Sequence, residues 1–175
     1  HEVMRAEVPG PVFGKVVAKL KNTAQILYII YLTMFVIFAA ILWLCGMPIF
    51  DSIITAMGGA GTGGFAVYND SIAHYHSDLI TYVVTVGTLL FGVNFNLYFY
   101  ILLRKIKFFF QDEELRTYFA IVAISTGLIV LNIFGIYHNL ADSFKYSFFE
   151  VSTIITTTGF GLTDITKWPL LSQYI

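Results

Sequence analysis

Residues 22–50 read NTAQILYIIYLTMFVIFAAILWLCGMPIF, twenty-nine residues without one charged side chain. Two further uncharged stretches, 79–103 and 117–141, have 25 residues each. A helix that crosses a bilayer needs about 20 mostly apolar residues. The three stretches therefore predict membrane-spanning helices near Ala24–Met47, Leu79–Leu103 and Tyr118–Tyr137.

The composition supports a membrane protein and excludes several other classes. Of the 175 residues, 57% are hydrophobic and 12% are charged, whereas a soluble domain carries about 25% charged residues. Ten Lys and Arg against eleven Asp and Glu leave no basic surplus for a nucleic-acid partner. The single cysteine excludes an internal disulfide framework. We therefore expect an all-α, multi-pass protein of the cell (inner or plasma) membrane, surrounded by lipid.

The basic residues predict how the spans are oriented. Eight of the ten precede the first span or lie between the second and third spans, where the positive-inside rule places them in the cytoplasm. These eight are Arg5, Lys15, Lys19, Lys21, Arg104, Lys105, Lys107 and Arg116.

Two shorter uncharged segments, 52–69 and 151–163, are too short to cross the membrane in the same way. The first is rich in glycine and the second in threonine, and we expect their helices to start at Asp51-Ser52 and Asp142-Ser143. Non-helical backbone at membrane depth is tolerated where it is buried in protein or lines a watery cavity. Two re-entrant helices that end in such loops predict a lined pathway.

The order of span, short helix and loop occurs twice, about 95 residues apart. Thr62-Gly63-Gly64-Phe65-Ala66 aligns with Thr157-Thr158-Gly159-Phe160-Gly161. We predict a cytoplasmic lead-in at 1–19, a helix–pore-loop–helix repeat at 20–105 and a truncated repeat at 106–175. The short helix and loop occupy about 51–66 in the first repeat and about 142–161 in the second. The chain starts at His1 and stops six residues after Trp168-Pro169, so we expect it to be a piece of a larger protein.

The residue types in the loops indicate cation chemistry. Thr157-Thr158-Gly159-Phe160-Gly161 has the same pattern as the Thr-Val-Gly-Tyr-Gly filter of potassium channels, in which backbone carbonyls replace the water around an ion. Glycine allows the backbone angles that such a strand needs. The C-terminal ends of the short helices carry partial negative charge, which favours a cation.

Other interpretations of the glycine-rich loop fit less well. Gly59-x-Gly61-x-x-Gly64 matches the dinucleotide-binding fingerprint, but that motif needs a preceding strand. A phosphate-binding loop would need Lys at the position of Phe65. Close helix packing by small residues explains Gly87 and Gly92, but not two matching loops.

A few polar residues outside the loops are further candidates. His74 and His76 could bind a transition metal, but two ligands on a loop make a weak site and a solvated loop is favoured. Glu150 lies near membrane depth in the second short helix, where an acid is a functional candidate. It could tune the field on a cation, hydrogen-bond to its neighbours or serve a structural role. We expect Asn94 and Asn96 to pack against other helices.

These motifs together resemble the Trk/Ktr/HKT superfamily of cation transporters, and the resemblance covers nearly the whole chain. The residues that carry it are Asp51–Gly61, Thr62-Gly63-Gly64-Phe65, Phe91-Gly92-Val93-Asn94-Phe95, Asp112-Glu113-Glu114-Leu115-Arg116, Ser152–Phe160, Asp164 and Trp168-Pro169. The resemblance implies four repeats around one pore, of which this chain holds about 1.6, the second and most of the third.

The resemblance also implies a site and partners. The filter residues would be Thr62, Gly63, Gly64, Phe65, Thr157, Thr158, Gly159 and Phe160. They would bind potassium as the transported ion, with no transition-metal site and no cofactor in this chain. Members of the family form homodimers and pair with a cytoplasmic nucleotide-binding regulatory subunit. The family's gating loop would follow Ile175, so no gate residue is assigned.

Three functional classes stay open. Potassium uptake through a carbonyl-lined filter is favoured, with a sodium or mixed-cation transporter of the same family as the alternative. A membrane enzyme is disfavoured because no credible catalytic set of residues recurs on one span. An assembly protein without transport would not need two filter-like loops.

Overall fold

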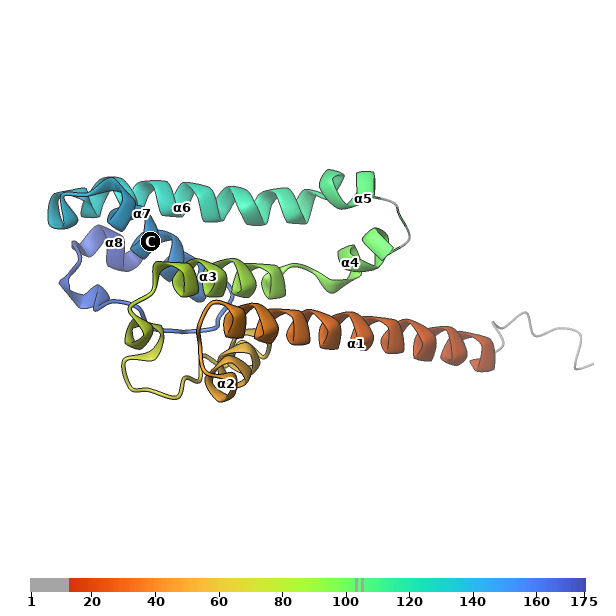
Figure 1. Cartoon of the computed structure of the whole chain (residues 1–175). Coiled ribbons are helices and arrows are strands. Elements are labelled where there is room, and N and C mark those ends of the chain that lie inside the picture. The colour runs from red at the N-terminus through yellow and green to blue at the C-terminus, as the bar shows by residue number, and fades with distance from the viewer. Residues whose placement is uncertain (1–12, 103, 105) are drawn as a thin grey trace, which may run out of the picture.

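The computed structural model describes residues 13–102, 104 and 106–175, and its described part consists of helices and loops without strands (Figure 1). The predicted all-α fold is thereby confirmed. Residues 1–12 of the predicted lead-in, with Arg5, and Lys105 lie outside the described residues. The α-helices are α1 (Phe13–Leu44), α2 (Ile49–Ala60), α3 (Asp78–Gly92), α4 (Phe95–Leu102), α5 (Ile106–Gln111), α6 (Glu113–Tyr137), α7 (Leu140–Ile155) and α8 (Leu170–Tyr174). The short 3-10 helices are η2 (Ser71–Tyr75) and η3 (Ile165–Lys167).

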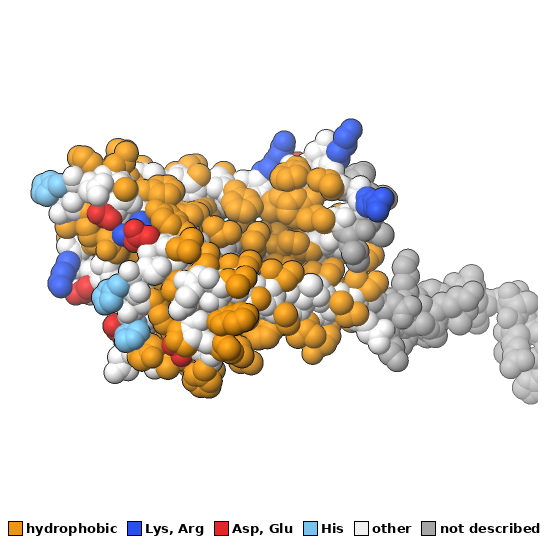
Figure 2. Space-filling view, viewed as in Figure 1, with side chains coloured by type: hydrophobic (Ala, Val, Ile, Leu, Met, Phe, Trp, Pro, Cys, Tyr) orange, Lys and Arg blue, Asp and Glu red, His pale blue; other side chains and the backbone are white. Residues whose placement is uncertain are grey.

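Two helices are long and apolar enough to cross a membrane unaided: α1 between Ala24 and Leu44, and α6 over its 25 residues. They run alongside α3 (Figure 1), and much of their apolar surface faces outward. Hydrophobic side chains form a broad band between two ends that carry the charged and histidine side chains (Figure 2). Burial in lipid explains such a surface, because a soluble protein exposes only small apolar patches. The first and third predicted spans are confirmed.

The predicted span Leu79–Leu103 is not a single helix, because the helix breaks between Gly92 and Phe95. The axes of α3 and α4 differ by 93°, so the pair is a broken span or a re-entrant turn. Asn94 favours the break: its Oδ1 accepts from the N–H of Asn96 at 3.0 Å, which caps α4. Its Nδ2 donates to Glu114 at 3.1 Å. Asn94 therefore terminates one helix and starts the next, a role that the expected helix packing did not include.

Both short helices exist, but they start earlier than predicted. Pro48 precedes α2, so Asp51 and Ser52 lie inside its first turns. Asn139 caps α7 through a 3.0 Å bond from the N–H of Ala141. The hydroxyls of Ser52 and Ser143 bond back to carbonyls four residues earlier instead of capping. The reason is that a serine oxygen can satisfy an i−4 carbonyl inside a helix as well as an orphan N–H at its start.

The main core joins the two halves of the chain. Phe149 and Phe160 from the second half pack against Phe38 and Leu42 of α1 and Ala56 of α2. A second cluster lies between α3, α6 and α7 and includes Leu89, Ile133 and Val151. The beginning of α1 and the α4–α5 link lie at one end of the bundle, and the turns into α2 and α7 at the other (Figure 1). Which end faces the cytoplasm stays a prediction.

Candidate functional site

The first loop turns sharply away from the end of α2. The N–H groups of Gly63 and Gly64 both donate to the carbonyl of Gly58, at 2.8 and 3.2 Å. Thr62 and Gly64 have positive φ angles of 50° and 62°. A β-branched residue rarely adopts such an angle, so Thr62 holds a strained conformation that its surroundings must stabilise.

The second loop repeats this geometry 95 residues later. The N–H groups of Thr158 and Gly159 both donate to the carbonyl of Thr153, at 2.8 and 3.1 Å. Thr157 and Gly159 have positive φ angles of 57° and 78°. Each loop therefore places a threonine and a glycine in the left-handed region two residues apart.

The loop carbonyls are left available by this arrangement. No hydrogen bond from a described residue reaches the carbonyl oxygens of residues 62–65 or 157–160. The N–H groups of residues 62–64 and 157–159 instead donate to carbonyls in the last turn of each short helix. Backbone carbonyls held in a fixed turn without a protein donor can bind a cation or water.

The two loops meet backbone to backbone. A Cβ atom on Gly64 would collide with the carbonyl oxygen of Thr158 and would lie 2.9–3.0 Å from the carbonyl group of Gly159. Gly159 has open space at the same point within the described part of the chain. The structure thus brings predicted site residues from both halves into contact.

The aromatic residues that end the two loops lie in different surroundings. Phe160 is 2% exposed, and its ring lies 3.1 Å from a Cβ placed on Gly58 and 3.7 Å from one on Gly59. Phe65 is 76% exposed. The alignment of the two loops makes Phe65 and Phe160 equivalent. Their packing differs, because among the described residues only Phe160 has a short helix of the other half beside it.

Buried threonine side chains stabilise the second loop. Thr157 points outward, whereas Thr158 is buried and its hydroxyl lies 2.8 Å from that of Thr156. The methyl group of Thr156 lies 2.8 Å from a Cβ placed on Gly92. Gly92 therefore sits against the base of this loop, at the break between α3 and α4. Its expected role in simple helix packing misses this contact.

The strand after the second loop is bound to the first half of the chain. The N–H of Gly161 donates to Ser71 Oγ at 3.2 Å, and its carbonyl accepts from the N–H of Ile72 at 3.1 Å. Glu150 faces the same strand from α7, and its carboxylate accepts from the N–H of Thr163 at 3.4 Å. Sequence analysis identified Glu150 but missed Ser71, since nothing local marks a serine as the partner of a glycine 90 residues away.

Further polar clusters lie in and around η2, between the first loop and α3. The His74 ring stacks on Tyr68 with centroids 3.5 Å apart, and His74 Nδ1 lies 3.4 Å from Asp70. Among the described residues, no group of three or more His, Cys, Asp or Glu could hold a metal ion. Tyr75 donates to Asp51 at 2.9 Å. Burial, together with the nearby Asp51 carboxylate, raises the pKa of Tyr75 and keeps it a donor.

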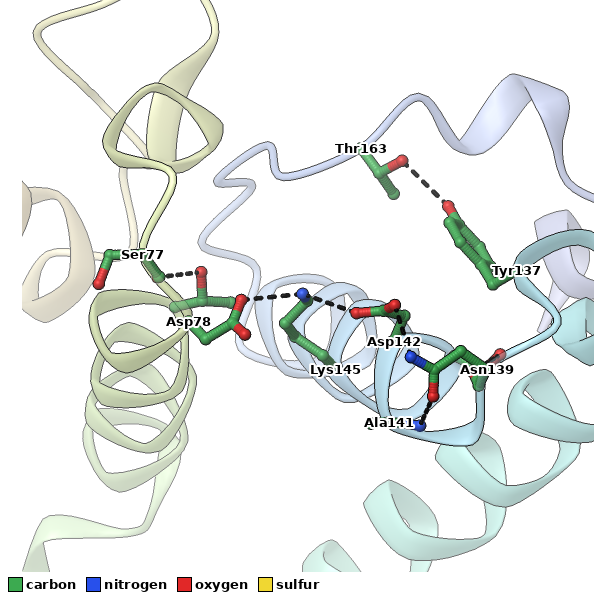
Figure 3. Close-up of polar contacts among 10 residues, drawn as sticks. Ser77, Asp78, Tyr137, Asn139, Ala141, Asp142, Lys145 and Thr163 are labelled. Carbon is green, nitrogen blue, oxygen red and sulfur yellow. Dashed lines mark hydrogen bonds and ion pairs between the residues drawn. The ribbon is translucent and has the colours of Figure 1, made fainter.

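A salt-bridge cluster joins the N-terminal ends of α3 and α7 (Figure 3). Lys145 Nζ donates to Asp78 at 2.8 Å and to Asp142 at 3.0 Å. Nearby, Tyr137 lies 3.3 Å from the Thr163 hydroxyl and accepts from Trp168 Nε1 at 3.2 Å. Separate polar clusters therefore gather at this end of the bundle.

The dinucleotide-binding interpretation has no structural support in the described residues. Gly59 lies inside α2 and Gly61 directly follows it, so no strand precedes them, and the next helix begins only at Ser71. The fingerprint needs the strand before it and the helix after it.

Comparison with known proteins identifies similar sequences over nearly the full chain. No family model matches. The Trk system potassium uptake protein TrkH of Salmonella typhimurium is 33% identical over 175 residues, 97% of this chain and 36% of that protein. TrkG of Escherichia coli is 32% identical over 174 residues, 96% of this chain and 35% of that protein. The chain thus spans about a third of the length of the curated relatives it matches.

A solved structure has the same fold. The potassium transporter TrkH from Vibrio parahaemolyticus matches with a TM-score of 0.84 at 28% identity, over 89% of this chain and 34% of that one. The broken helix, the short helices α2 and α7 and the paired loops thus belong to a fold that this chain shares with a membrane transporter. Sequence and fold together show that this chain is a segment of a protein of the Trk/Ktr/HKT superfamily.

Proposed function

We propose that this chain supplies two filter strands, at 62–65 and 157–160, to a protein that takes up potassium across the cell membrane. The observation that carries the proposal is the contact between two loops of the same backbone geometry, with Gly64 against the carbonyls of Thr158 and Gly159. The names of the relatives support potassium as the ion.

The mechanism follows from the exposed carbonyls. A potassium ion that loses its water needs several oxygen ligands, and the loop carbonyls accept no hydrogen bond from any described residue. The C-terminal ends of α2 and α7 adjoin the loops and carry partial negative charge. Binding must still be weak enough for release, which favours neutral carbonyls over carboxylates.

Two strands do not surround an ion, so further strands complete the pathway. The packing of Phe160 suggests how they are added, because each loop would place its aromatic ring against the short helix of the preceding repeat. Phe65 has no such helix among the described residues. A preceding repeat would cover it.

The first test is uptake of rubidium, a potassium substitute, by the complete protein in liposomes. We expect potassium to compete with rubidium. We also expect Gly159→Asp to abolish uptake, because an added carboxylate would block the filter or bind the ion too tightly for release. Gly46→Asp is the matched control: Gly46 also has a positive φ and open space around it, but it lies in the α1–α2 turn.

The outcomes separate the alternatives. If sodium inhibits rubidium uptake as strongly as potassium does, the protein is a mixed-cation transporter. Uptake unchanged by Gly159→Asp would show that this loop is not the pathway. No catalysis and no cofactor are required by this function. A homodimer and a cytoplasmic nucleotide-binding regulatory subunit complete the proposal, and both rest on the family resemblance.

A further inference from the structure

The strand 160–163, which leaves the second filter loop, is held from two sides. On one side, Gly161 exchanges two hydrogen bonds with Ser71 and Ile72 of the first half, at 3.2 and 3.1 Å. On the other side lies Glu150 of α7. A segment that is held on two sides is fixed in position. The carbonyls of the loop that precedes it are then fixed as well.

Glu150 is the second of these two anchors. It is 6% exposed, and its Oε1 atom accepts from the N–H of Thr163 at 3.4 Å. The backbone of Leu162 also interacts with its carboxyl group. The hydrogen bond from Thr163, together with the interaction of Leu162, ties this segment of the backbone to α7.

No cation neutralises Glu150 within the described part of the chain. The nearest lysine on the same helix, Lys145, is bound to Asp78 and Asp142 instead. Buried carboxylates are retained where hydrogen bonds satisfy them. The backbone of 162–163 is therefore the partner that Glu150 has, and each depends on the other.

The first half of the chain lacks this anchor. Thr55 stands 95 residues before Glu150, at the same point relative to its loop, and is 1% exposed. Its hydroxyl has no hydrogen-bond partner in the described structure. The difference is specific to the second loop and supplies a matched control at the equivalent position.

We propose that Glu150 is a positioning residue that sets the carbonyl geometry of the second filter strand by holding residues 162 and 163. The proposal rests on the potassium pathway described above. Glu150 acts through the backbone and does not itself bind the ion. Its loss would let the strand shift and would admit ions of a different size.

The test compares Glu150→Ala, Glu150→Thr and Glu150→Gln in the complete protein in liposomes, with sodium and rubidium uptake measured side by side. We expect the Ala and Thr variants to raise the sodium-to-rubidium ratio by about tenfold, the lower end of what loss of an outer partner does to an ion site. Glu150→Gln keeps an acceptor oxygen and should keep the wild-type ratio. Thr55→Val removes the unpartnered hydroxyl of the first half and should also leave the ratio unchanged.

Hydrogen exchange supplies a readout that does not depend on transport. The amides of Leu162 and Thr163 should exchange faster in the Ala and Thr variants and at the wild-type rate in Glu150→Gln. Unchanged exchange or an unchanged ion ratio in the truncated variants would overturn the proposal. So would a Gln variant as impaired as Ala, since charge and not hydrogen bonding would then matter. Absence of rubidium uptake by the wild-type protein would instead refute the proposed function, while the exchange rates would still test the anchor.

Discussion

At the scale of single residues, neighbouring glycines in the first loop have different requirements. Gly64 has a positive φ and faces the backbone of the second loop, so neither its angle nor its surroundings admit a side chain. A Cβ on Gly63 would meet only the ring of Phe65, at 3.0 Å, and that ring is exposed and can turn away. The equivalent position in the second loop is Thr158, which already carries a side chain.

Gly64→Ala should therefore abolish rubidium uptake by the complete protein. The left-handed angle alone costs about 1–2 kcal/mol for a residue with a Cβ, and the collision with the Thr158 carbonyl adds to it. Gly63→Ala should keep most of the uptake. Equal loss in both variants would show that the loop tolerates no side chain anywhere and that the contact between the loops is not the cause.

At the scale of elements, the break between α3 and α4 depends on two tyrosine side chains and one glycine. Helix breaks leave carbonyls without an intrahelical donor. Tyr118 donates to the carbonyl of Leu89 at 3.1 Å, and Tyr98 donates to that of Leu90 at 2.6 Å. Gly92 leaves room for Tyr118, whose hydroxyl lies 2.6 Å from a Cβ placed there.

Gly92→Ala should destabilise the protein by about 1–3 kcal/mol, the usual cost of overpacking. The added methyl group would push Tyr118 away from Leu89 and press on Thr156 at the base of the second loop. Thermal unfolding in detergent measures the change. Gly135→Ala in α6 is the control, because a Cβ there meets nothing within 4 Å, and replacing a helical glycine should be neutral or slightly stabilising. If both variants melt alike, Gly92 is not crowded.

At the scale of the whole molecule, Lys145 links the two halves at the N-terminal ends of α3 and α7. Its 12% exposed side chain bridges Asp78 of α3 and Asp142 of α7. Burial alone would lower the pKa of Lys145, but the hydrogen bonds to the two carboxylates outweigh it and raise that pKa above its usual range. The hydrogen bond and charge of Lys145 lower the pKa of Asp142.

The pH dependence of this link follows from the directions of the two pKa shifts, downward for Asp142 and upward for Lys145. Asp142 stabilises the fold above its ordinary pKa of 3.8, and this stabilisation is lost as the pH falls through its lowered value. Lys145 stabilises below 10.5, and this stabilisation is lost only as the pH rises through its raised value. The link should therefore be fully present near neutral pH.

Lys145→Met should lower the melting temperature at neutral pH, and its difference from the wild type should shrink as the pH falls below 3.8 and through the lowered pKa of Asp142. Lys167→Met is the control, since the Lys167–Asp164 pair is largely exposed, and exposed pairs contribute about 0–1 kcal/mol. A Lys145→Met difference that stays constant down to acid pH would mean that packing, not the ion pairs, holds the two ends together.

The sequence alone determined the all-α membrane class, the first and third spans, the two short helices and the alignment of the two loops. These features are local or periodic: charge-free runs long enough for a bilayer, glycine and threonine at chosen positions, and one pattern that recurs. Backbone preferences and transfer into lipid act residue by residue, so a linear pattern records them.

Tertiary structure alone decided where the second span breaks, how the two loops meet and what holds the strand after the second loop. The break needs Tyr98 and Tyr118 to satisfy the freed carbonyls, and Tyr118 comes from the next span. The contacts of Gly64 with Thr158 and of Gly161 with Ser71 join residues 90 or more positions apart. The burial of Phe160 and the exposure of Phe65 likewise follow from which half lies beside each ring. Such contacts depend on the arrangement of helices in space, which no local pattern of residues specifies.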